Sequence, residues 1–240
     1  MDQAIALSVE NLVGGYGSMT ILNGTTFEVP EGSITTVIGP NGAGKSTVFK
    51  AIFGLLKLRQ GRVVFHGQDV TGKSQRQLLD AGICYIPQGR NIFPELSVRT
   101  NIELGTVAAG KSISNIAERI ERGLDRFPSL RKLGDKQAGT LSGGLQKQLE
   151  IVRGLLLEPR LVLIDEPSIG LSPALTDVMF GVVKSLNDQG ITVLLVEQNV
   201  AKSLALSSRG YVLENGSVVL HGSSGELLEN PDVQRAYLGM

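Results

Sequence analysis

A glycine-rich segment of this chain has the composition of a phosphate-binding loop. It runs Gly39-Pro40-Asn41-Gly42-Ala43-Gly44-Lys45-Ser46-Thr47 and fits the pattern G-x-x-x-x-G-K-[ST] at every position. Its glycines permit positive φ angles, so that successive backbone N–H groups can surround a phosphate. In such a loop Lys45 reaches the β- and γ-phosphates, the Ser46 hydroxyl ligates Mg²⁺ and Thr47 bonds an inner phosphate. The alternative is a glycine-rich turn without a ligand.

Two adjacent carboxylates, Asp165 and Glu166, follow a short apolar run. Residues 161–164 have the composition of a strand buried on both faces, and Pro167 is expected to end that strand. The C-terminal end of such a strand is where open α/β sheets bind ligands. Because adjacent strand residues point to opposite sides, we expect Asp165 to hold a metal ion and Glu166 to act as general base on the attacking water. The alternative is a solvated acidic turn.

A second candidate anion site lies in the segment Leu141-Ser142-Gly143-Gly144-Leu145-Gln146. Apolar residues follow this segment at helical spacing, at positions 145, 149, 152 and 156, so Ser142 falls where an N-cap residue stands. The two glycines leave backbone N–H groups uncovered, and a bare helix N-terminus attracts anions. The alternative is a capped helix with a flexible entry loop.

Along the chain the phosphate loop comes first, residues 141–146 second and the carboxylate pair third, and this order of motifs resembles the ABC ATPase family over essentially the whole chain. Tyr16 resembles the aromatic residue that stacks on adenine. Gln88 resembles the glutamine that joins the core to the helical subdomain and senses the metal and the water. The resemblance implies an ATPase that uses ATP and Mg²⁺. It also implies that two chains, identical or different, close head to tail, so that residues 142–144 of one chain touch the γ-phosphate held by Lys45 of the other.

Several phrases resemble the ATPase subunits of importers for branched-chain amino acids and related amides and urea. They lie at residues 85–94, 168–173, 196–199, 210–216 and 236–239. This resemblance implies an integral membrane permease as partner and a periplasmic or surface solute-binding protein as an indirect partner. It also implies a peripheral location on the cytoplasmic face of the cell membrane. An apolar group at Phe93, Pro94, Leu96 and Val98 is either subdomain core or part of a groove that receives a helix of the permease.

Two positions depart from the general family pattern. Ser172 stands where the loop after Pro167 usually carries Asp, and Gln198 stands at the switch position, which usually carries His. A Gln amide can donate a hydrogen bond to a phosphate oxygen, but it carries neither a proton for transfer nor a positive charge. We therefore predict that Gln198 is a neutral sensor of the γ-phosphate, so that turnover does not depend on a His titrating near neutral pH. The alternative is that Gln198 caps the next helix.

The elements that position these motifs form an alternating pattern of strands and helices. Strands are predicted at residues 6–10, 25–29, 34–38, 62–66, 161–164, 191–196, 211–213 and 218–220. Helices are predicted from Lys45 to Leu56, with Gly54 inside, over most of residues 98–157 with a break at Pro128, over residues 175–186, and in short pieces around Pro231. Alternation of this kind predicts an α/β fold with a mostly parallel sheet and flanking helices.

The resemblance adds detail to this fold. It implies a P-loop NTPase core, an N-terminal antiparallel β subdomain and an inserted helical subdomain. We expect one ABC ATPase domain over residues 1–240. Residues 1–88 and 159–240 would form the nucleotide-binding core, and residues 89–158 would form the helical subdomain that carries the signature motif.

Composition excludes several other classes. Hydrophobic residues make up 42% of the chain and charged residues 19%, which is typical of a compact globule. The formal net charge is zero, so no nucleic-acid partner is expected. The first 44 residues contain no Lys or Arg, so we expect no signal peptide or presequence. No apolar run approaches the ~20 residues needed to span a bilayer, so a membrane role requires a partner. Cys84 is the only cysteine, which excludes an intrachain disulfide and favours a buried structural thiol.

Two other functions remain to be compared with that of an importer ATPase. An ABC protein can act on ribosomes or DNA without a permease, but such proteins usually carry paired cassettes, long coiled-coil insertions or basic extensions. A nucleotide-binding module can also lack hydrolysis, but the intact Glu166 argues against this alternative.

Overall fold

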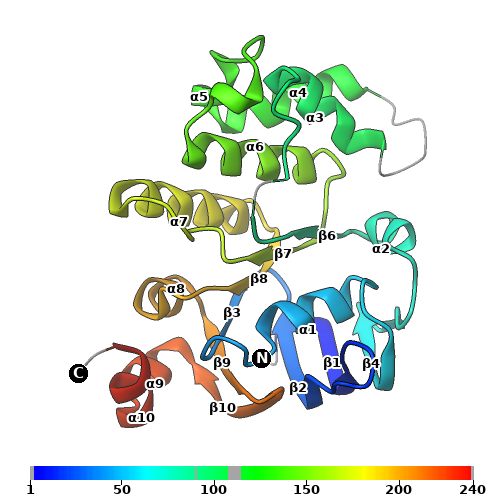
Figure 1. The fold of residues 1–240 in the computed structure, drawn as a ribbon, viewed down its shortest axis with the longest axis vertical. Helices are drawn as coiled ribbons and strands as arrows, with labels where there is room; N and C mark the ends of the chain where they lie inside the picture. Colours follow the sequence, from blue (N-terminus) through cyan, green and yellow to red (C-terminus); the bar gives the residue numbers. More distant parts are fainter. Residues whose placement is uncertain (1–2, 90, 108–114, 239–240) are drawn as a thin grey trace.

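The computed structural model describes residues 3–89, 91–107 and 115–238. Arg90 and Gly239, which belong to two of the importer-like phrases, lie outside the described residues. The strands are β1 (Ile5–Gly14), β2 (Leu22–Pro30), β3 (Ile34–Ile38), β4 (Leu58–Phe65), β5 (Gln68–Asp69), β6 (Ile83–Ile86), β7 (Leu161–Asp165), β8 (Thr192–Val196), β9 (Arg209–Glu214) and β10 (Ser217–Ser223). The helices are α1 (Lys45–Ile52), α2 (Gln75–Ala81), α3 (Val98–Val107), α4 (Ile116–Arg126), α5 (Pro128–Arg131), α6 (Gly143–Leu155), α7 (Pro173–Asp188), α8 (Val200–Leu206), α9 (Ser224–Glu229) and α10 (Pro231–Val233). Helices α3 to α6 gather at one end of the molecule, and β1, β2 and β4 lie toward the other (Figure 1).

The larger sheet carries the strands that end at the candidate site. Its strand order is β10-β9-β3-β8-β7-β6, with parallel pairing from β9 to β6 and antiparallel pairing of β10 with β9. Leu163 of β7 belongs to the same hydrophobic core as Phe49 of α1. Its neighbour Val162 belongs to a second core with Leu149 of α6. Because both faces are covered, β7 is apolar from Leu161 to Ile164, and the parallel pairing from β9 to β6 confirms the predicted mostly parallel sheet.

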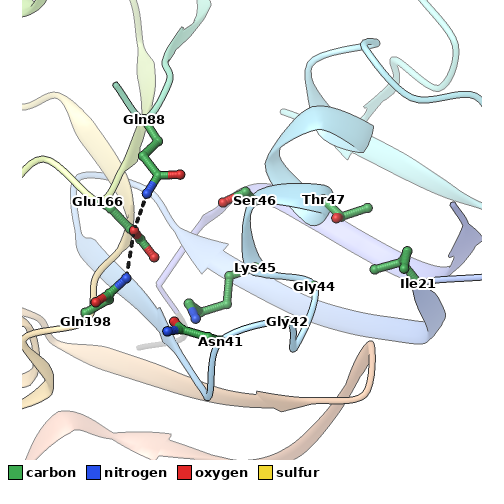
Figure 2. A pocket seen from close by; sticks show the side chains of 10 residues that line it. All are labelled: Ile21, Asn41, Gly42, Gly44, Lys45, Ser46, Thr47, Gln88, Glu166 and Gln198. Carbon is green, nitrogen blue, oxygen red and sulfur yellow. Dashed lines mark hydrogen bonds between the residues drawn. The ribbon is translucent and has the colours of Figure 1, made fainter. Parts of the chain in front are cut away.

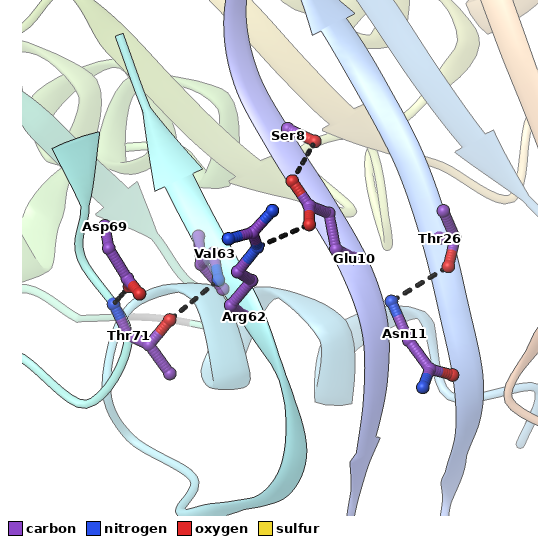
Figure 3. Close-up of polar contacts among 8 residues, drawn as sticks. All are labelled: Ser8, Glu10, Asn11, Thr26, Arg62, Val63, Asp69 and Thr71. Carbon is purple, nitrogen blue, oxygen red and sulfur yellow. Dashed lines mark hydrogen bonds and ion pairs between the residues drawn. The ribbon is translucent and has the colours of Figure 1, made fainter. Parts of the chain in front are cut away.

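The smaller sheet is antiparallel, with the order β2-β1-β4-β5, which confirms the predicted N-terminal antiparallel β subdomain. Polar contacts join its strands (Figure 3). The Val63 N–H donates to the Thr71 hydroxyl at 2.8 Å, and Arg62 forms an ion pair with Glu10 across β4 and β1. The Arg62 side chain is 61% exposed, so this ion pair contributes little to stability.

The region predicted to be mostly helical between residues 98 and 157 consists of several shorter helices. α4 ends at Arg126, and Pro128 stands in the first turn of α5, where a proline needs no hydrogen bond from its nitrogen. Residues 132–137 are not helical, so the predicted helix was too long. Among the described residues, no helix is long and apolar enough to cross a bilayer.

One prediction near the phosphate loop was wrong, and one nearby helix was not predicted. The first helix ends at Ile52 and does not continue through Gly54, which has a φ of +67°. A Cβ at Gly54 would lie 2.4 Å from the backbone oxygen of Lys73, so close approach of another segment requires glycine there. Helix α2 was not predicted from the sequence; it is short and begins with a capping box between Ser74 and Gln77.

Candidate nucleotide-hydrolysis site

The predicted phosphate loop lies between β3 and α1 and borders a cavity of about 440 Å³. Ten described residues line the cavity: Ile21, Asn41, Gly42, Gly44, Lys45, Ser46, Thr47, Gln88, Glu166 and Gln198 (Figure 2). Nine of them were predicted as site residues. Ile21 was missed, since it is an ordinary apolar residue before β2 and reaches the loop only in three dimensions, where its Cγ2 would lie 3.3 Å from a Cβ on Gly44.

Two glycines are essential to the shape of this loop. A Cβ on Gly39 would lie 2.1 Å from the backbone oxygen of Leu213, which no larger residue can tolerate. Gly44 is the N-cap of α1 with a φ of 103°, a conformation that glycine adopts without steric cost. The helix therefore begins at Lys45 with its first N–H groups directed at the loop.

The Lys45 side chain is held inside the loop. It is 5% exposed, and its Nζ donates to the backbone oxygens of Gly39 at 2.8 Å and Pro40 at 3.0 Å. Burial lowers the pKa of Lys45, and the nearby carboxylates of Glu166 and Asp165 partly oppose that effect. Phosphate oxygens are stronger acceptors for an ammonium than these carbonyls, so the lysine is prepared to bind an anion.

Asp165 ends β7, and its side chain contacts other groups than Glu166 does. Its Oδ1 accepts from the Ser46 hydroxyl at 3.0 Å, and its Oδ2 accepts from the Tyr85 hydroxyl at 3.0 Å. Burial raises the pKa of Asp165, and these two hydrogen bonds only partly offset the rise. Burial and the adjacent Asp165 carboxylate likewise raise the pKa of Tyr85. The folded protein therefore holds a carboxylate that a cation at this position would stabilise.

This raised pKa predicts how Asp165 affects stability. Its contribution to the free energy of unfolding is fully present below the pKa of Asp165 in the unfolded chain, near 3.8. This contribution is lost as the pH rises through the higher pKa of Asp165 in the folded protein. We expect Asp165→Asn, which cannot ionise, to melt at a higher temperature than the parent protein at pH 7 without nucleotide. Turnover should fall at least about 100-fold, since metal ligation is worth several kcal/mol.

Thermal unfolding between pH 4 and pH 8 checks this expectation. The melting temperatures of the two proteins should converge toward acid pH. A parent protein that is more stable than Asp165→Asn at pH 7 would contradict it. Asp177→Asn, at an exposed carboxylate that pairs with Lys202, is the control.

Glu166 faces the cavity from a strained backbone. Its φ is +46°, and its N–H donates to the backbone oxygen of Val196 at 2.9 Å. The strand thus ends at Asp165, one residue earlier than the predicted stop at Pro167. The two acids do contact different groups, as expected, but Glu166 turns away because of this left-handed backbone and not through strand alternation. Its Oε2 accepts from the side-chain amides of Gln88 at 2.7 Å and Gln198 at 3.0 Å (Figure 2).

A buried ion pair on α6 holds the segment that carries Gln88. Lys147 and Glu150 lie 2.8 Å apart with side chains 8% and 3% exposed. Lys147 donates to the backbone oxygen of Pro87 at 3.0 Å, and Glu150 accepts from the N–H of Asn91. This pair was not predicted, because its signal in the sequence is only opposite charge at i,i+3 on a helix.

The second candidate anion site borders a second cavity, which shares Glu166 with the phosphate-loop cavity. Ser142 is the N-cap of α6, as predicted, but in the part of the chain that the structure describes its hydroxyl makes no capping hydrogen bond. Ser142 is exposed, and Gly144 packs on Leu175 of α7. Gly143 borders a different cavity, of about 190 Å³, so the described structure does not bring residues 142–144 into the lining of the phosphate-loop cavity of their own chain.

Three other residues that the sequence singled out are Tyr16, Ser172 and Cys84. Tyr16 is 48% exposed and contacts Lys50 of α1, whose Nζ lies 5.8 Å from the ring centre, and it is not among the described residues that line the cavity. Ser172 is the N-cap of α7 and accepts from the Leu175 N–H, a role that both Ser and Asp perform well. Cys84 is buried, as predicted, and burial raises its pKa to about 12.

The apolar group after Gln88 divides into two parts. Val98 is fully buried in the core of the helical layer. Phe93 is 50% exposed and Leu96 37%, and the guanidinium carbon of Arg153 lies 6.0 Å from the centre of the Phe93 ring. Core packing therefore accounts for Val98, whereas Phe93 and Leu96 remain available to a partner.

Comparisons with known proteins agree with this geometry. Residues 22–169 match the family model described as ABC transporter. The chain is 38% identical to the high-affinity branched-chain amino acid transport ATP-binding protein BraG of Pseudomonas aeruginosa, over 97% of this chain and 99% of BraG. It is 30% identical to the lipopolysaccharide export system ATP-binding protein LptB of Escherichia coli, over 97% of both chains.

A solved structure shares the whole fold. The ADP conformation of MJ1267, an ATP-binding cassette of an ABC transporter, superposes with a TM-score of 0.90 and is 32% identical, covering 99% of this chain and 100% of that chain. The family match covers more than half of the chain, and the relatives match almost all of it. The chain therefore belongs to the ABC transporter family as an ATP-binding protein, an ATPase that energises transport.

Proposed function

We propose that this chain hydrolyses ATP with Glu166 as general base. The observation that carries the proposal is the pair of amides on one oxygen of Glu166, beside Lys45 in one cavity. Two N–H donors fix the carboxylate in one orientation and leave its other oxygen to accept from water. Lys45 and the loop N–H groups hold the β- and γ-phosphates, and Gln198 donates to a γ-phosphate oxygen as a neutral sensor.

The residues around Ser46 fit a magnesium ion. The Ser46 hydroxyl and the Asp165 carboxylate supply hard oxygen ligands that lie 3.0 Å apart, and the raised pKa of Asp165 indicates a carboxylate that lacks a compensating cation. Ser46 and Asp165 would hold the ion, with Gln88 close by, and the ion would neutralise charge on the phosphate oxygens.

A second chain is proposed to complete the site. Residues 142–144 form a helix N-terminus outside the lining of the phosphate-loop cavity of their own chain, Ser142 is exposed there, and its side chain is free of a capping role within the described structure. In a head-to-tail dimer this terminus would bind the γ-phosphate held by the partner, and Tyr16 would contact adenine. We assign residues 1–88 and 159–240 to the nucleotide-binding core and residues 89–158 to the helical subdomain of one domain.

The transported solutes are proposed to be branched-chain amino acids or related small polar molecules, taken up through a partner permease. Support comes from BraG and from the branched-chain amino acid transport protein LivF of Archaeoglobus fulgidus, which is 36% identical over 98% of this chain. The likeness to LptB defines the alternative, which is lipopolysaccharide export. The chain would act on the cytoplasmic face of the membrane, with a solute-binding protein as an indirect partner and no nucleic acid.

Uptake of labelled leucine by cells that lack this chain tests the solute. Restoring the parent chain should restore leucine uptake, whereas Glu166→Gln at the same cellular level should not. Restored uptake of urea or an amide instead would reassign the solute within the same proposal. Normal leucine, amide and urea uptake in the deletion strain would contradict import. Co-purification from detergent extract separates a permease partner from ribosomes or nucleic acid.

Phe93→Asp should uncouple transport from hydrolysis. Phe93 is half exposed beside Arg153, so a carboxylate there removes an apolar docking contact without opening a core cavity. We expect at least a tenfold loss of uptake, with ATP turnover of the isolated chain within about twofold of the parent. Val178→Asp, at an equally exposed apolar residue on α7, is the control. Normal uptake by Phe93→Asp would remove the docking role.

A further inference from the structure

Glu197 is a buried carboxylate between the two segments that hold the catalytic groups. It follows β8 directly and is 1% exposed. One oxygen, Oε1, accepts from the N–H of Ser168 at 2.9 Å. The other, Oε2, accepts from the Ser168 hydroxyl at 2.8 Å and from the N–H groups of Gln198 at 3.0 Å and Asn199 at 3.3 Å. This carboxylate therefore joins the chain just after Glu166 to the segment that carries Gln198.

The hydrogen-bond pattern requires a carboxylate. Every hydrogen bond that the described residues make to the Glu197 side chain comes from a donor, and donors approach both oxygens. An amide offers one acceptor and two donors. With its oxygen at the Oε2 position, the amide nitrogen of Gln would face the Ser168 N–H, and the opposite orientation would place it against three donors. Glu197→Gln keeps the size of the side chain and yet breaks the pattern.

The location of these contacts gives the pattern a function. Ser168 lies two residues after Glu166, and Gln198 donates to Glu166 Oε2 at 3.0 Å. The exposed side chains of Gln88 and Gln198 have no core packing to hold them, so their positions depend on their backbones. Lys147 and Glu150 hold the backbone near Gln88. On the other side of the base, Glu197 holds the backbone at Gln198 and Asn199 in an equivalent way.

We infer that Glu197 is a positioning residue for hydrolysis, which holds the Gln198 amide and the turn after Glu166 in the arrangement that orients the base. It acts through backbone N–H groups and does not touch the cavity. This inference rests on the proposed role of Glu166 as base. Loss of the pattern should lower the catalytic rate without weakening ATP binding, because the phosphate loop and Lys45 lie on other segments.

Steady-state ATP hydrolysis by the purified full chain tests the inference, together with the dissociation constant of a fluorescent ATP analogue. We expect Glu197→Gln to lower kcat at least tenfold and to leave the dissociation constant within threefold. Glu197→Asp, which keeps the acceptors on a shorter side chain, should retain more activity than Glu197→Gln. Glu226→Gln is the matched control, because Glu226 also accepts the N–H and hydroxyl of one serine, Ser223, but lies on α9.

The effect should also pass through Gln198. In a background that carries Gln198→Ala, Glu197→Gln should lower kcat by a smaller factor than in the parent protein, because only its contacts with Ser168 then act on the base. Turnover by Glu197→Gln within twofold of the parent would overturn the inference. So would equal losses of kcat and ATP affinity, multiplicative effects with Gln198→Ala, or an Asp variant that is less active than the Gln variant. Normal turnover by Glu166→Gln would instead refute the proposed base, whatever Glu197 does. If Glu197→Gln does not fold, the inference is tested instead by comparing the kcat of Glu197→Asp with the kcat of Gln198→Ala.

Discussion

Glu166→Gln should lower ATP turnover by about 10²–10⁴-fold while ATP binding survives. The amide cannot accept a proton from water, and its nitrogen would face the donors of Gln88 and Gln198 if it occupied the position of Oε2. ATP affinity should change little, because Lys45 and the loop N–H groups bind the phosphates from other segments. The variant should also hold ATP unhydrolysed and thereby favour the closed dimer.

Single-turnover hydrolysis and equilibrium ATP binding measure the two halves of this expectation. Glu226→Gln should behave as the parent protein in both, since it neutralises a carboxylate far from the cavity. A Glu166→Gln protein that turns over ATP at a tenth of the parent rate or faster would show that another group accepts the proton. Loss of binding together with turnover would show that Glu166 serves the structure of the loop instead.

Ser142→Arg should abolish ATP-dependent dimerisation and turnover while the isolated chain still binds ATP. The Ser142 side chain is exposed and makes no capping hydrogen bond within the described structure, so the fold loses little when it is replaced. A long cationic side chain at this position would prevent close approach of the helix N-terminus to a neighbouring phosphate. Ser142→Ala, which removes the hydroxyl without adding bulk, should retain the fold and most of the dimerisation.

Mixing two inactive variants tests whether the site is shared. A Lys45→Ala chain retains residues 142–144, and a Ser142→Arg chain retains Lys45. If sites form between chains, mixed dimers contain one intact site, so ATP-dependent dimers and turnover reappear. If each chain uses its own residues, both sites in the mixture are damaged and neither signal returns. Size-exclusion chromatography of differently labelled chains detects the mixed dimer independently of turnover.

Local sequence patterns predicted the parts of the site that are local in the chain. The phosphate loop is set by spacing within nine residues, and the adjacent carboxylates Asp165 and Glu166 stand at the end of a short apolar run. The alternation of strands and helices predicted a mostly parallel sheet, and the apolar run at residues 161–164 predicted a strand covered on both faces. Gln88 and Gln198 came from the family resemblance, and the shared oxygen of Glu166 was found in the structure.

The missed features depend on contacts between distant segments. Glu197 and Ser168 are 29 residues apart, and Lys147 reaches Pro87 across 60 residues. Both buried carboxylates, Glu150 and Glu197, are charged residues in an apolar stretch of sequence. This is a signal in itself, because a glutamate is rarely buried without a partner. The end of α1 was predicted wrongly for a similar reason, because Gly54 is required by the backbone of Lys73 and not by the helix itself.

The N-terminus of helix α6 lies outside the lining of the phosphate-loop cavity, whereas its second turn is hydrogen-bonded to the segment that carries Gln88. Its N-terminus, at Ser142, is the surface proposed to bind the partner's nucleotide, and Lys147 in its second turn is tied to the backbone beside Gln88. In the proposed dimer, a displacement of α6 by a neighbour's γ-phosphate would therefore shift an amide that orients this chain's own base. Each chain would then report the occupancy of the other site, and the two ATP molecules would bind with a coupling free energy.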